Sequence, residues 1–593
     1  MCGICGFVGF EDQGLIKRMC DSIAHRGPDD RGYYIGENVS LGHTRLSIID
    51  LGSGHQPIHN ESEDVWTIFN GEIYNYRELT TLLRKKGHSF YTNSDTEVIV
   101  HAYEEFGVKF VEMLDGMFSI AIWDERNKCL ILARDRIGKK PLYYTEVGNS
   151  ILFSSEIKSI LEFREVKREV NFDLLSHYLS YRSTPNDATL FNGIKKLPPG
   201  GVLFKSGTLI SIQKFWKLPE SSPMTGGNAG SIDKFIDLLD EAIQKRMISD
   251  VPIGAYLSGG IDSSSVVARA AQYTDRPLDT FTVGFGEHTD EFMYAKEVAE
   301  YVGTNHHEIV VDSYDIKRVL PKIVWHLDEP IADPAVIPTY LMSKETKRHV
   351  DVVLTGEGAD ELFAGYPKYK LFTYPLRVLP RRLRYSVYQY SPPYTVFNTK
   401  EKKELLLDGT LVNCKRSEPF PPVADISLSG VIRQDIEYWL PNYLLMKVDK
   451  MTMAHGLEAR VPFLDYKLVE YSMNLPDCFK INGLTGKYIL RKSMSKSLPK
   501  RIVNRAKKGF PLPLNKWINE DLGEIMVSEL HNSTIINEKF APEAVNKILR
   551  NTDSWQPVKK FRSAHQAWLL FLFALWYEMF ISGDQSGGLH YDF

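Results

Sequence analysis

The sequence predicts two folded halves: an α+β layered domain, then an α/β domain with a parallel sheet and a helical C-terminal part. Three observations predict this arrangement. Short β-branched and aromatic runs, separated by turn residues, fill the chain up to about Trp216. Pro, Gly and Ser then interrupt every periodicity over 217–231. After that, a strand, a glycine turn and a helix recur in this order, which is typical of a parallel sheet covered by helices.

The first half shows the elements of an α+β domain. Strands are predicted at 65–71, 117–125, 128–135 and 150–156. Arg126 and Asn127 join the second strand to the third, which predicts a hairpin. Helical periodicity appears at 76–87 and 96–107, and each of these segments closes on a glycine. We therefore place the first domain at 1–215 and a linker at 216–231.

The second domain, 232–593, begins with alternating elements. Strands are predicted at 251–258, 278–285, 307–311 and from 351, with helices at 264–273 and 291–303. Beyond about residue 370 the pattern is mostly helical. The most apolar stretch, 567–581, is short for a bilayer span of about 20 residues and contains Glu578. It predicts a buried C-terminal helix.

Composition excludes several classes of protein. The 593 residues carry 71 basic and 75 acidic side chains, so the net charge of −4 lacks the basic excess of a nucleic-acid binder. Thirty Tyr, thirty Phe and nine Trp exclude a disordered chain. The six cysteines are too scattered for a disulfide framework, and the first residues lack the pattern of a signal peptide. We therefore expect a cytoplasmic protein that binds neither nucleic acid nor membrane.

Cys2 directly follows the initiator methionine. Removal of Met1 would leave a thiol nucleophile on the residue that carries a free α-amine, which can serve as its base. A cysteine at this position is more often incidental, and Cys2 with Cys5 also forms a CxxC pair. That pair lacks the second pair that zinc needs and the βαβ context of a redox motif. We therefore favour the nucleophile once its neighbours are considered.

Five motifs follow in order: 2–6 (CGICG), 25–29 (HRGPD), 42–48 (GHTRLSI), 69–75 (FNGEIYN) and 94–97 (SDTE). As a set, they resemble the glutaminase domain of class II glutamine amidotransferases, an N-terminal nucleophile fold built as an αββα sandwich. The resemblance implies that Cys2 attacks the glutamine amide, with Asn70 and Gly71 as the oxyanion hole. It implies a glutamine site made of Arg45, Leu46, Ser47, Ile48, Ile49, Asn70, Gly71, Glu72 and Asp95.

The chemistry of these residues fits that implication. Arginine suits the α-carboxylate of an amino acid through its planar fork, and a carboxylate suits its α-amine. A tetrahedral intermediate needs donors aimed at its oxyanion. Taken singly, Arg45 or Asp95 is more typical of a solvated surface charge and Asn70-Gly71 of a turn. The functional interpretation depends on the set.

A second motif, Leu257-Ser-Gly-Gly-Ile-Asp-Ser-Ser264, lies where a strand gives way to a helix. Small residues there let backbone N–H groups approach a phosphate, although a plain turn with a helix cap explains a generic SGG string equally well. SGGIDSS resembles the pyrophosphate loop of ATP pyrophosphatases, and 354–361 (LTGEGADE) their second nucleotide loop. The implied ATP-binding residues are Leu257, Ser258, Gly259, Gly260, Asp262, Ser263, Ser264, Val283, Thr355, Gly356 and Lys507. Asp262 and Asp360 would hold Mg²⁺, and Glu357 would support the acyl-adenylate step.

Over nearly its whole length the chain resembles the family of glutamine-hydrolysing asparagine synthetases, and 454–465 (AHGLEARVPFLD) also matches their pattern. The resemblance implies glutamine, aspartate, ATP and Mg²⁺ as substrates and cofactor, with ammonia passing between two sites. An apolar passage would keep the ammonia unprotonated. The acceptor wall is expected at 355–360, with Lys450 and Arg460 as unassigned cations. Glu458 and Arg460 are equally well explained as a buried ion pair.

Three alternatives stay open. An enzyme of the same architecture could act on another carboxylate, such as a cell-wall diamino acid or a sugar acid. A β-lactam-forming or peptide-cyclising relative would use an internal amine, but such relatives tend to lack the Cys2 set. A non-catalytic binding protein would be expected to carry a damaged 258–264 loop. The oligomeric state is open, with a homodimer as one option.

Overall fold

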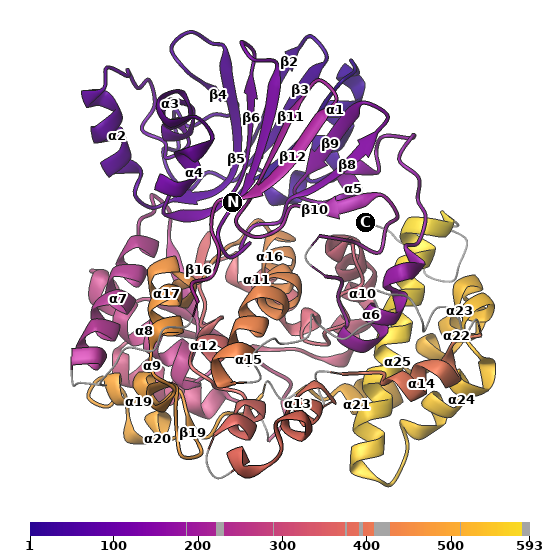
Figure 1. The fold of residues 1–593 in the computed structure, drawn as a ribbon. Coiled ribbons are helices and arrows are strands. Elements are labelled where there is room, and N and C mark those ends of the chain that lie inside the picture. The colour runs from indigo at the N-terminus through magenta and orange to yellow at the C-terminus, as the bar shows by residue number, and fades with distance from the viewer. Residues whose placement is uncertain are drawn as a thin grey trace.

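The computed structural model describes residues 1–185, 187–220, 230–288, 290–373, 376–390, 395–407, 427–509 and 512–583. Its N-terminal half contains two six-stranded antiparallel sheets that face each other (Figure 1). The first has the order β10 (Ile194–Lys196), β8 (Tyr143–Val147), β9 (Ser150–Ser154), β1 (Gly3–Val8), β3 (Val39–Arg45) and β2 (Asp30–Gly36). The second has the order β12 (Leu209–Lys214), β11 (Gly201–Ser206), β7 (Cys129–Arg134), β6 (Gly116–Asp124), β5 (Val65–Ile73) and β4 (Ile58–His59).

Helices cover the outer face of each sheet, which makes the αββα sandwich that was predicted. The outer helices are α1 (Gln13–Ser22) and α5 (Ile157–Ile160) on the first sheet, and α2 (Tyr76–Lys85), α3 (Glu97–Phe106) and α4 (Phe110–Met113) on the second. Successive side chains of β1 point to opposite faces of its sheet. Ile4 packs between the two sheets, and Cys5 packs against α1. Strands with two buried faces need near-continuous apolar runs, and the sequence has them.

The predicted hairpin is confirmed, because β6 pairs antiparallel with β7 and Asp124 lies opposite Cys129. The helices predicted at 76–87 and 96–107 are α2 and α3. The predicted linker is described at its two ends, and residues 221–229 lie outside the described part, as do Cys414 and Phe510.

The second half contains a five-stranded sheet in which every neighbouring pair is parallel. Its order is β15 (Asn305–Val310), β14 (Asp279–Gly284), β13 (Ile253–Tyr256), β16 (Val352–Leu354) and β17 (Glu458–Arg460). The four predicted strands are present. The fifth, β17, was missed in a region predicted to be mostly helical, because three residues carry no measurable periodicity. A small hairpin, β18 (Ile481–Asn482) with β19 (Thr485–Gly486), was missed too.

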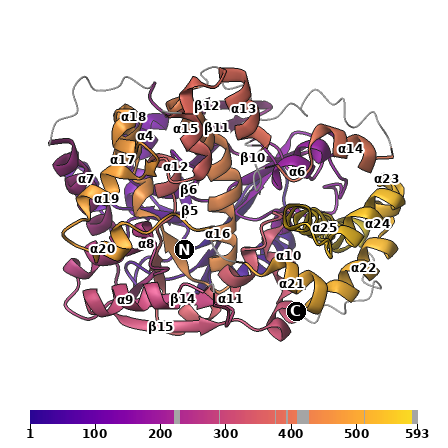
Figure 2. The same ribbon diagram turned by 90° about the horizontal axis from the view of Figure 1, so that it is seen from below.

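Helices surround this sheet and fill the C-terminal part (Figure 2). They are α7 (Gly230–Arg246), α8 (Ile261–Ala270), α9 (Phe292–Val302), α10 (Ser313–Leu327), α11 (Val336–Thr346), α12 (Ala359–Leu362) and α16 (Leu445–Met453) near the sheet. Further helices are α6 (Leu175–Tyr181), α13 (Arg381–Tyr390), α14 (Thr399–Leu405), α15 (Leu428–Gln434), α17 (Tyr466–Asn474), α18 (Asp477–Lys480), α19 (Tyr488–Ser493), α20 (Lys500–Val503), α21 (Leu514–Lys516), α22 (Gly523–Asn532), α23 (Thr534–Lys539), α24 (Pro542–Asn551) and α25 (Pro557–Tyr577).

Helix α25 is the predicted buried C-terminal helix. Within the described residues, 557–582 is the one segment long and apolar enough to cross a membrane, and 72% of its most apolar window is buried inside the protein. Trp568 and Trp576 are fully buried. The indole of Trp576 donates a hydrogen bond to the carbonyl of Asp328 at 2.7 Å. These contacts explain the hydropathy of α25 as that of a core helix.

The two halves meet along a buried boundary, and the N-terminus of the chain lies there (Figure 1). Met1 is only 1% exposed, and its amine lies 3.2 Å from Glu458 Oε2 on β17 of the second half. Cys2, which follows it, is therefore placed at the boundary between the two halves.

Candidate functional site

Cys2 lies at the start of β1, with Asn70 of β5 beside it. Its backbone N–H donates to Asn70 Oδ1 at 3.2 Å, and its carbonyl accepts from Arg26 Nε at 3.2 Å. Burial raises the pKa of the Cys2 thiol. Because Asn70 Oδ1 accepts this bond, Nδ2 points elsewhere, and it is buried with no hydrogen-bond partner among the described residues. A buried free donor beside a thiol is what an oxyanion hole requires.

Gly71 continues β5 with φ +156°, and a Cβ at this position would collide with the carbonyl of Met117 on β6. Arg45 ends β3 and is buried. Its Nη2 donates to the carbonyls of Asp50 at 2.5 Å and Ile49 at 3.3 Å, so the 46–50 segment curls around its guanidinium. These hydrogen bonds to backbone carbonyls hold the guanidinium of Arg45 in one orientation.

Three buried carboxylates gather next to this loop: Glu72, Asp95 and, from the second half, Glu458. Arg460 lies 2.6 Å from Glu458 and 3.3 Å from Glu72, and the Met1 amine lies against Glu458. Burial raises the pKa of Asp95 to about 7 and that of Glu72 well above its usual value. The excess of carboxylates over cations in this group favours an added ammonium ion.

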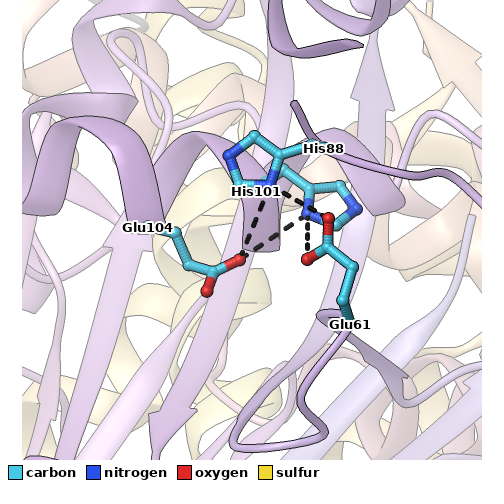
Figure 3. A group of neighbouring side chains, drawn as sticks. All are labelled: Glu61, His88, His101 and Glu104. Carbon is cyan, nitrogen blue, oxygen red and sulfur yellow. Dashed lines mark hydrogen bonds and ion pairs between the residues drawn. The ribbon is translucent and has the colours of Figure 1, made fainter. Parts of the chain in front are cut away.

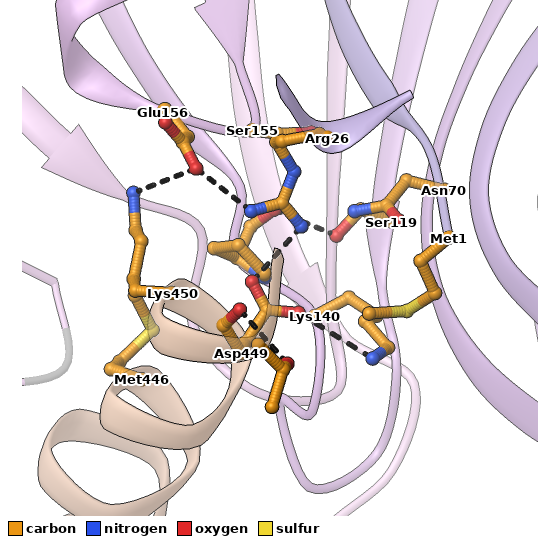
Figure 4. Close-up of polar contacts among 12 residues, drawn as sticks. Met1, Arg26, Asn70, Ser119, Lys140, Ser155, Glu156, Met446, Asp449 and Lys450 are labelled. Atoms are coloured by element: carbon orange, nitrogen blue, oxygen red, sulfur yellow. Dashed lines mark hydrogen bonds and ion pairs between the residues drawn. The ribbon is translucent and has the colours of Figure 1, made fainter. Parts of the chain in front are cut away.

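Buried ion pairs also line the boundary near Cys2 (Figure 4). Arg26 lies 2.9 Å from Glu156 and 2.9 Å from Asp449, so it joins the first half to α16 of the second. Lys450, also on α16, lies 2.7 Å from Asp328 and 3.8 Å from Glu156. Every one of these side chains is nearly inaccessible to solvent. The network holds the two halves in a fixed relation.

A cavity of about 380 Å³ opens at the carboxyl ends of β13, β14 and β16. The predicted residues that line it are Leu257, Ser258, Gly260, Asp262, Ser263, Val283, Thr355, Gly356, Glu357, Asp360 and Lys507. Two predicted residues do not line it. Gly259 (φ +66°) packs against Tyr294, where a Cβ would come within 2.5 Å, and Ser264 is fully buried in α8.

Lysines neutralise the two predicted metal ligands. Lys487 Nζ lies 2.5 Å from Asp262 and 2.6 Å from Asp360, and Lys507 Nζ lies 2.7 Å from Asp360. Although burial opposes it, the two ammonium groups hold the pKa of Asp360 at about 2. Asp262 Oδ1 is buried without a hydrogen-bond partner in the described chain. A free carboxylate oxygen and an ionised neighbour fit a hard cation such as Mg²⁺.

A second charged group borders the cavity. Lys447 of α16 lies 3.0 Å from Asp333, and burial raises the pKa of nearby Glu357. Arg505 Nη1 donates to the carbonyl of Ser258 at 3.2 Å and so ties the basic 505–509 segment to the SGG loop. The cavity thus has carboxylates, cations and a helix N-terminus converging on it, as an anionic phosphate ligand requires.

Comparison with known proteins identifies the family. A family model for the glutamine amidotransferase domain matches residues 1–216, and one for asparagine synthase matches 234–578. Asparagine synthetase [glutamine-hydrolyzing] 1 of Bacillus subtilis is 34% identical over 627 residues, which cover 97% of each chain. The chain belongs to the glutamine-hydrolysing asparagine synthetase family. Asparagine synthetase [glutamine-hydrolyzing] 2 of Oryza sativa is 33% identical over 571 residues, covering 91% of this chain and 82% of that protein.

As a member of the asparagine synthetase family, the chain is an enzyme, an ATP-dependent carbon–nitrogen ligase. The structure places the two cations that the sequence left unassigned. Lys450 and Arg460 do not line the cavity, and buried carboxylates at the boundary pair with both. Glu458 and Arg460 do form the buried pair that was considered.

Sequence reasoning missed Lys487, Lys447 and Arg491, which line the cavity. Lys487 sits in the left-handed region, with φ 55°, directly before α19. In the sequence, the one signal for Lys487 is a Gly-Lys pair before a helical segment. This pattern is too common to predict a residue of the cavity. Lys447, which lines the cavity, lies one helical turn before Lys450 on α16.

Proposed function

We propose that the chain is a glutamine-dependent asparagine synthetase that hydrolyses glutamine at Cys2 and amidates aspartate at the ATP-binding cavity. The products would be asparagine, glutamate, AMP and pyrophosphate. One observation carries the proposal. The pair Asp262 and Asp360, bridged by Lys487, stands at the SGGIDSS loop of a cavity in the same chain as the buried Cys2–Asn70 contact.

In the glutaminase step, removal of Met1 gives Cys2 a free α-amine, whose ordinary pKa of about 8 suits a general base. The amine accepts the thiol proton, and the sulfur attacks the amide carbon of glutamine. Asn70 Nδ2 and the Gly71 N–H donate to the oxyanion. The protonated amine returns its proton to the amide nitrogen, which leaves as ammonia. Water then hydrolyses the thioester to glutamate and frees the thiol. Arg45 would hold the α-carboxylate of glutamine.

Glu72 and Asp95 would hold the α-ammonium of glutamine. This assignment is supported by the buried carboxylates described above, which outnumber the cations around them. The Met1 amine contacts one of these carboxylates, Glu458. Once Met1 is removed, Glu458 loses this ammonium contact and keeps Arg460 as its partner. A substrate ammonium would restore the balance. Leu46, Ser47, Ile48 and Ile49 would form the wall next to Arg45.

In the synthetase step, the α-phosphate of ATP is attacked by the β-carboxylate of aspartate. The α8 N-terminus, with Ser258, Gly260 and Ser263, would bind the phosphates, and Lys487 and Lys507 would neutralise the departing pyrophosphate. Asp262 and Asp360 would hold Mg²⁺, which when bound supplies further positive charge to the phosphates. Ammonia then displaces AMP from the β-aspartyl adenylate.

The most detailed part of the proposal is the identity of the acceptor, the carboxylate that receives the ammonia. Residues 355–360 form one wall of the cavity, and Lys447 beside Glu357 supplies a cation for the α-carboxylate of aspartate. The alternative is an amidotransferase of the same architecture that acts on another carboxylate. A cytoplasmic location is supported by the free thiols of the five described cysteines. The domain boundaries at 215 and 232, a homodimer and an apolar ammonia passage stay predictions.

The deciding experiment measures pyrophosphate release with ATP and Mg²⁺ across a panel of carboxylates. Aspartate should stimulate release, and AMP should appear in equal amount. Adding glutamine should then yield asparagine and glutamate. ADP with orthophosphate as products would contradict the assignment of the SGGIDSS loop. No response to aspartate, with turnover of a larger carboxylate, would transfer the proposal to the alternative.

A further inference from the structure

Two histidines and two glutamates converge at the outer edge of the first half, away from the residues assigned above (Figure 3). Glu61 lies in the loop between β4 and β5, His88 follows α2, and His101 and Glu104 lie one turn apart on α3. One possible ligand atom from each residue lies within 4.8 Å of the others. The residues come from three separate segments, so only the fold brings them together.

The distances within this four-residue cluster suit a tetrahedral metal ion. His88 Nδ1 lies 3.1 Å from Glu61 and 3.9 Å from Glu104, and His101 Nδ1 lies 3.3 Å and 3.7 Å from the same two carboxylates. Zinc with ligands at about 2.0–2.2 Å has ligand-to-ligand edges of about 3.3–3.6 Å in a tetrahedron. These four contacts lie close to that range, with Glu61 facing His88 through Oε1 and His101 through Oε2, and one candidate ligand atom from each residue lies within 4.8 Å of the others.

A second carboxylate lies behind each imidazole. His101 Nε2 forms a hydrogen bond with Glu97 Oε1 at 3.4 Å, whereas His88 Nε2 lies 3.4 Å from Glu105 Oε1 and makes no hydrogen bond within the described chain. Glu97 is itself held by the backbone N–H groups of residues 91 and 92 at 2.8 and 2.7 Å. A carboxylate on the far nitrogen of each ligating imidazole is the usual support of a metal-bound histidine.

Two of the atoms that face the centre lack hydrogen-bond partners, whereas Glu61 Oε1 also accepts from the backbone N–H of Ser89 at 2.9 Å. Glu104 uses Oε1 to accept from Asn60 at 2.8 Å and Arg126 at 2.9 Å, which leaves its Oε2 for the centre. Glu104 Oε2 and His101 Nδ1 are buried and make no hydrogen bond within the described chain, and His101 is fully inaccessible. The cluster thus attracts positive charge.

We propose that Glu61, His88, His101 and Glu104 bind one divalent transition-metal ion, zinc by preference, in a closed structural site. Four protein ligands leave no open position for chemistry, and mixed imidazole and carboxylate donors suit zinc. The ion ties the β4–β5 loop and the end of α2 to α3. Helix α3 begins two residues after Asp95, so the site also steadies the segment that carries this residue.

The test uses full-length enzyme stripped with a chelator, incubated with Zn²⁺ and desalted, with metal counted by mass spectrometry. Wild-type protein should retain one zinc ion per chain and unfold at a higher temperature than the stripped form. His88→Gln and Glu61→Gln should each lose the retained zinc and the thermal gain. His531→Gln, at an exposed histidine of α22, is the matched control and should keep both.

Substitution with Co²⁺ distinguishes this site from the thiols. Tetrahedral oxygen and nitrogen ligands give visible d–d absorption without a thiolate charge-transfer band. Such a spectrum in wild-type enzyme, absent in His88→Gln, is expected. A thiolate band would place the ion on a cysteine and overturn the proposal. Retention of equal zinc by wild type and His88→Gln, or of none by wild type, would also overturn it.

Discussion

Lys487 offers the sharpest test of how the nucleotide cavity is held together. Its ammonium lies between Asp262 at 2.5 Å and Asp360 at 2.6 Å, and its side chain is only 2% exposed. Lys487→Met keeps most of the side-chain length and removes the charge. Asp262 then loses its ion-pair partner, whereas Asp360 keeps Lys507 at 2.7 Å.

The expected cost follows from this asymmetry. Removing one partner of a buried ion pair costs about 3–5 kcal/mol, and the remaining Lys507 contact places this variant near the lower end, at about 3 kcal/mol. Magnesium should offset much of the loss, since a hard cation can take the place of the ammonium between two carboxylates. At a Mg²⁺ concentration of about 100 times its dissociation constant, the gain is about 2.7 kcal/mol.

The assay compares urea unfolding midpoints with and without Mg²⁺, together with both half-reactions. The variant should unfold earlier than wild type without Mg²⁺ and gain more from its addition. Pyrophosphate release should fall roughly 10²–10³-fold, as expected for loss of an electrostatic contact to the reacting group. Glutamine hydrolysis should persist. Lys492→Met, an exposed lysine of helix α19, which follows Lys487, is the control. An unchanged midpoint, or synthesis at the parental rate, would refute the reasoning.

Three further predictions concern the same two sites. Cys2→Ala should abolish glutamine use but retain synthesis from ammonium salts, and an intact mass that includes Met1 in fully active enzyme would contradict the proposed base. Glu357→Gln should stop ATP-dependent product formation while glutaminase activity persists; parental synthesis would remove this residue from the mechanism. Asp95 has a folded pKa of about 7 against 3.8 in its unfolded reference, so its ionisation lowers stability as pH rises through this window. Asp95→Asn should therefore be more stable than wild type above about pH 7. The KM of the wild-type enzyme for glutamine should fall as pH rises towards 7, because Asp95 becomes ionised. A wild-type KM that does not change with pH would count against a contact between Asp95 and the ammonium of glutamine.

The sequence by itself was sufficient for several features that depend on local order. Buried strands such as β6 and β7 can be recognised as apolar runs in the sequence, because a strand that is covered on both faces has few polar side chains. The glycine turns at 258–260 and 356–358 follow strands and precede helices, so the position of the cavity could be predicted from chain order alone. Asp262 and Asp360 were predicted because they lie in or beside these turns, and Lys507 because its basic segment resembles that of the family; the three do come together.

Only the tertiary structure decided which charges meet. Lys487 is 225 residues from Asp262, and Arg460 lies far along the chain from Glu72, so no spacing rule could pair them. Strand β17 is three residues long and is recognisable only by its pairing with β16. A buried charge is costly unless an opposite charge lies beside it. Here the opposite charges are brought together when the two halves pack against each other. Local sequence sets the elements, and the contact between elements sets the chemistry of each ionisable group.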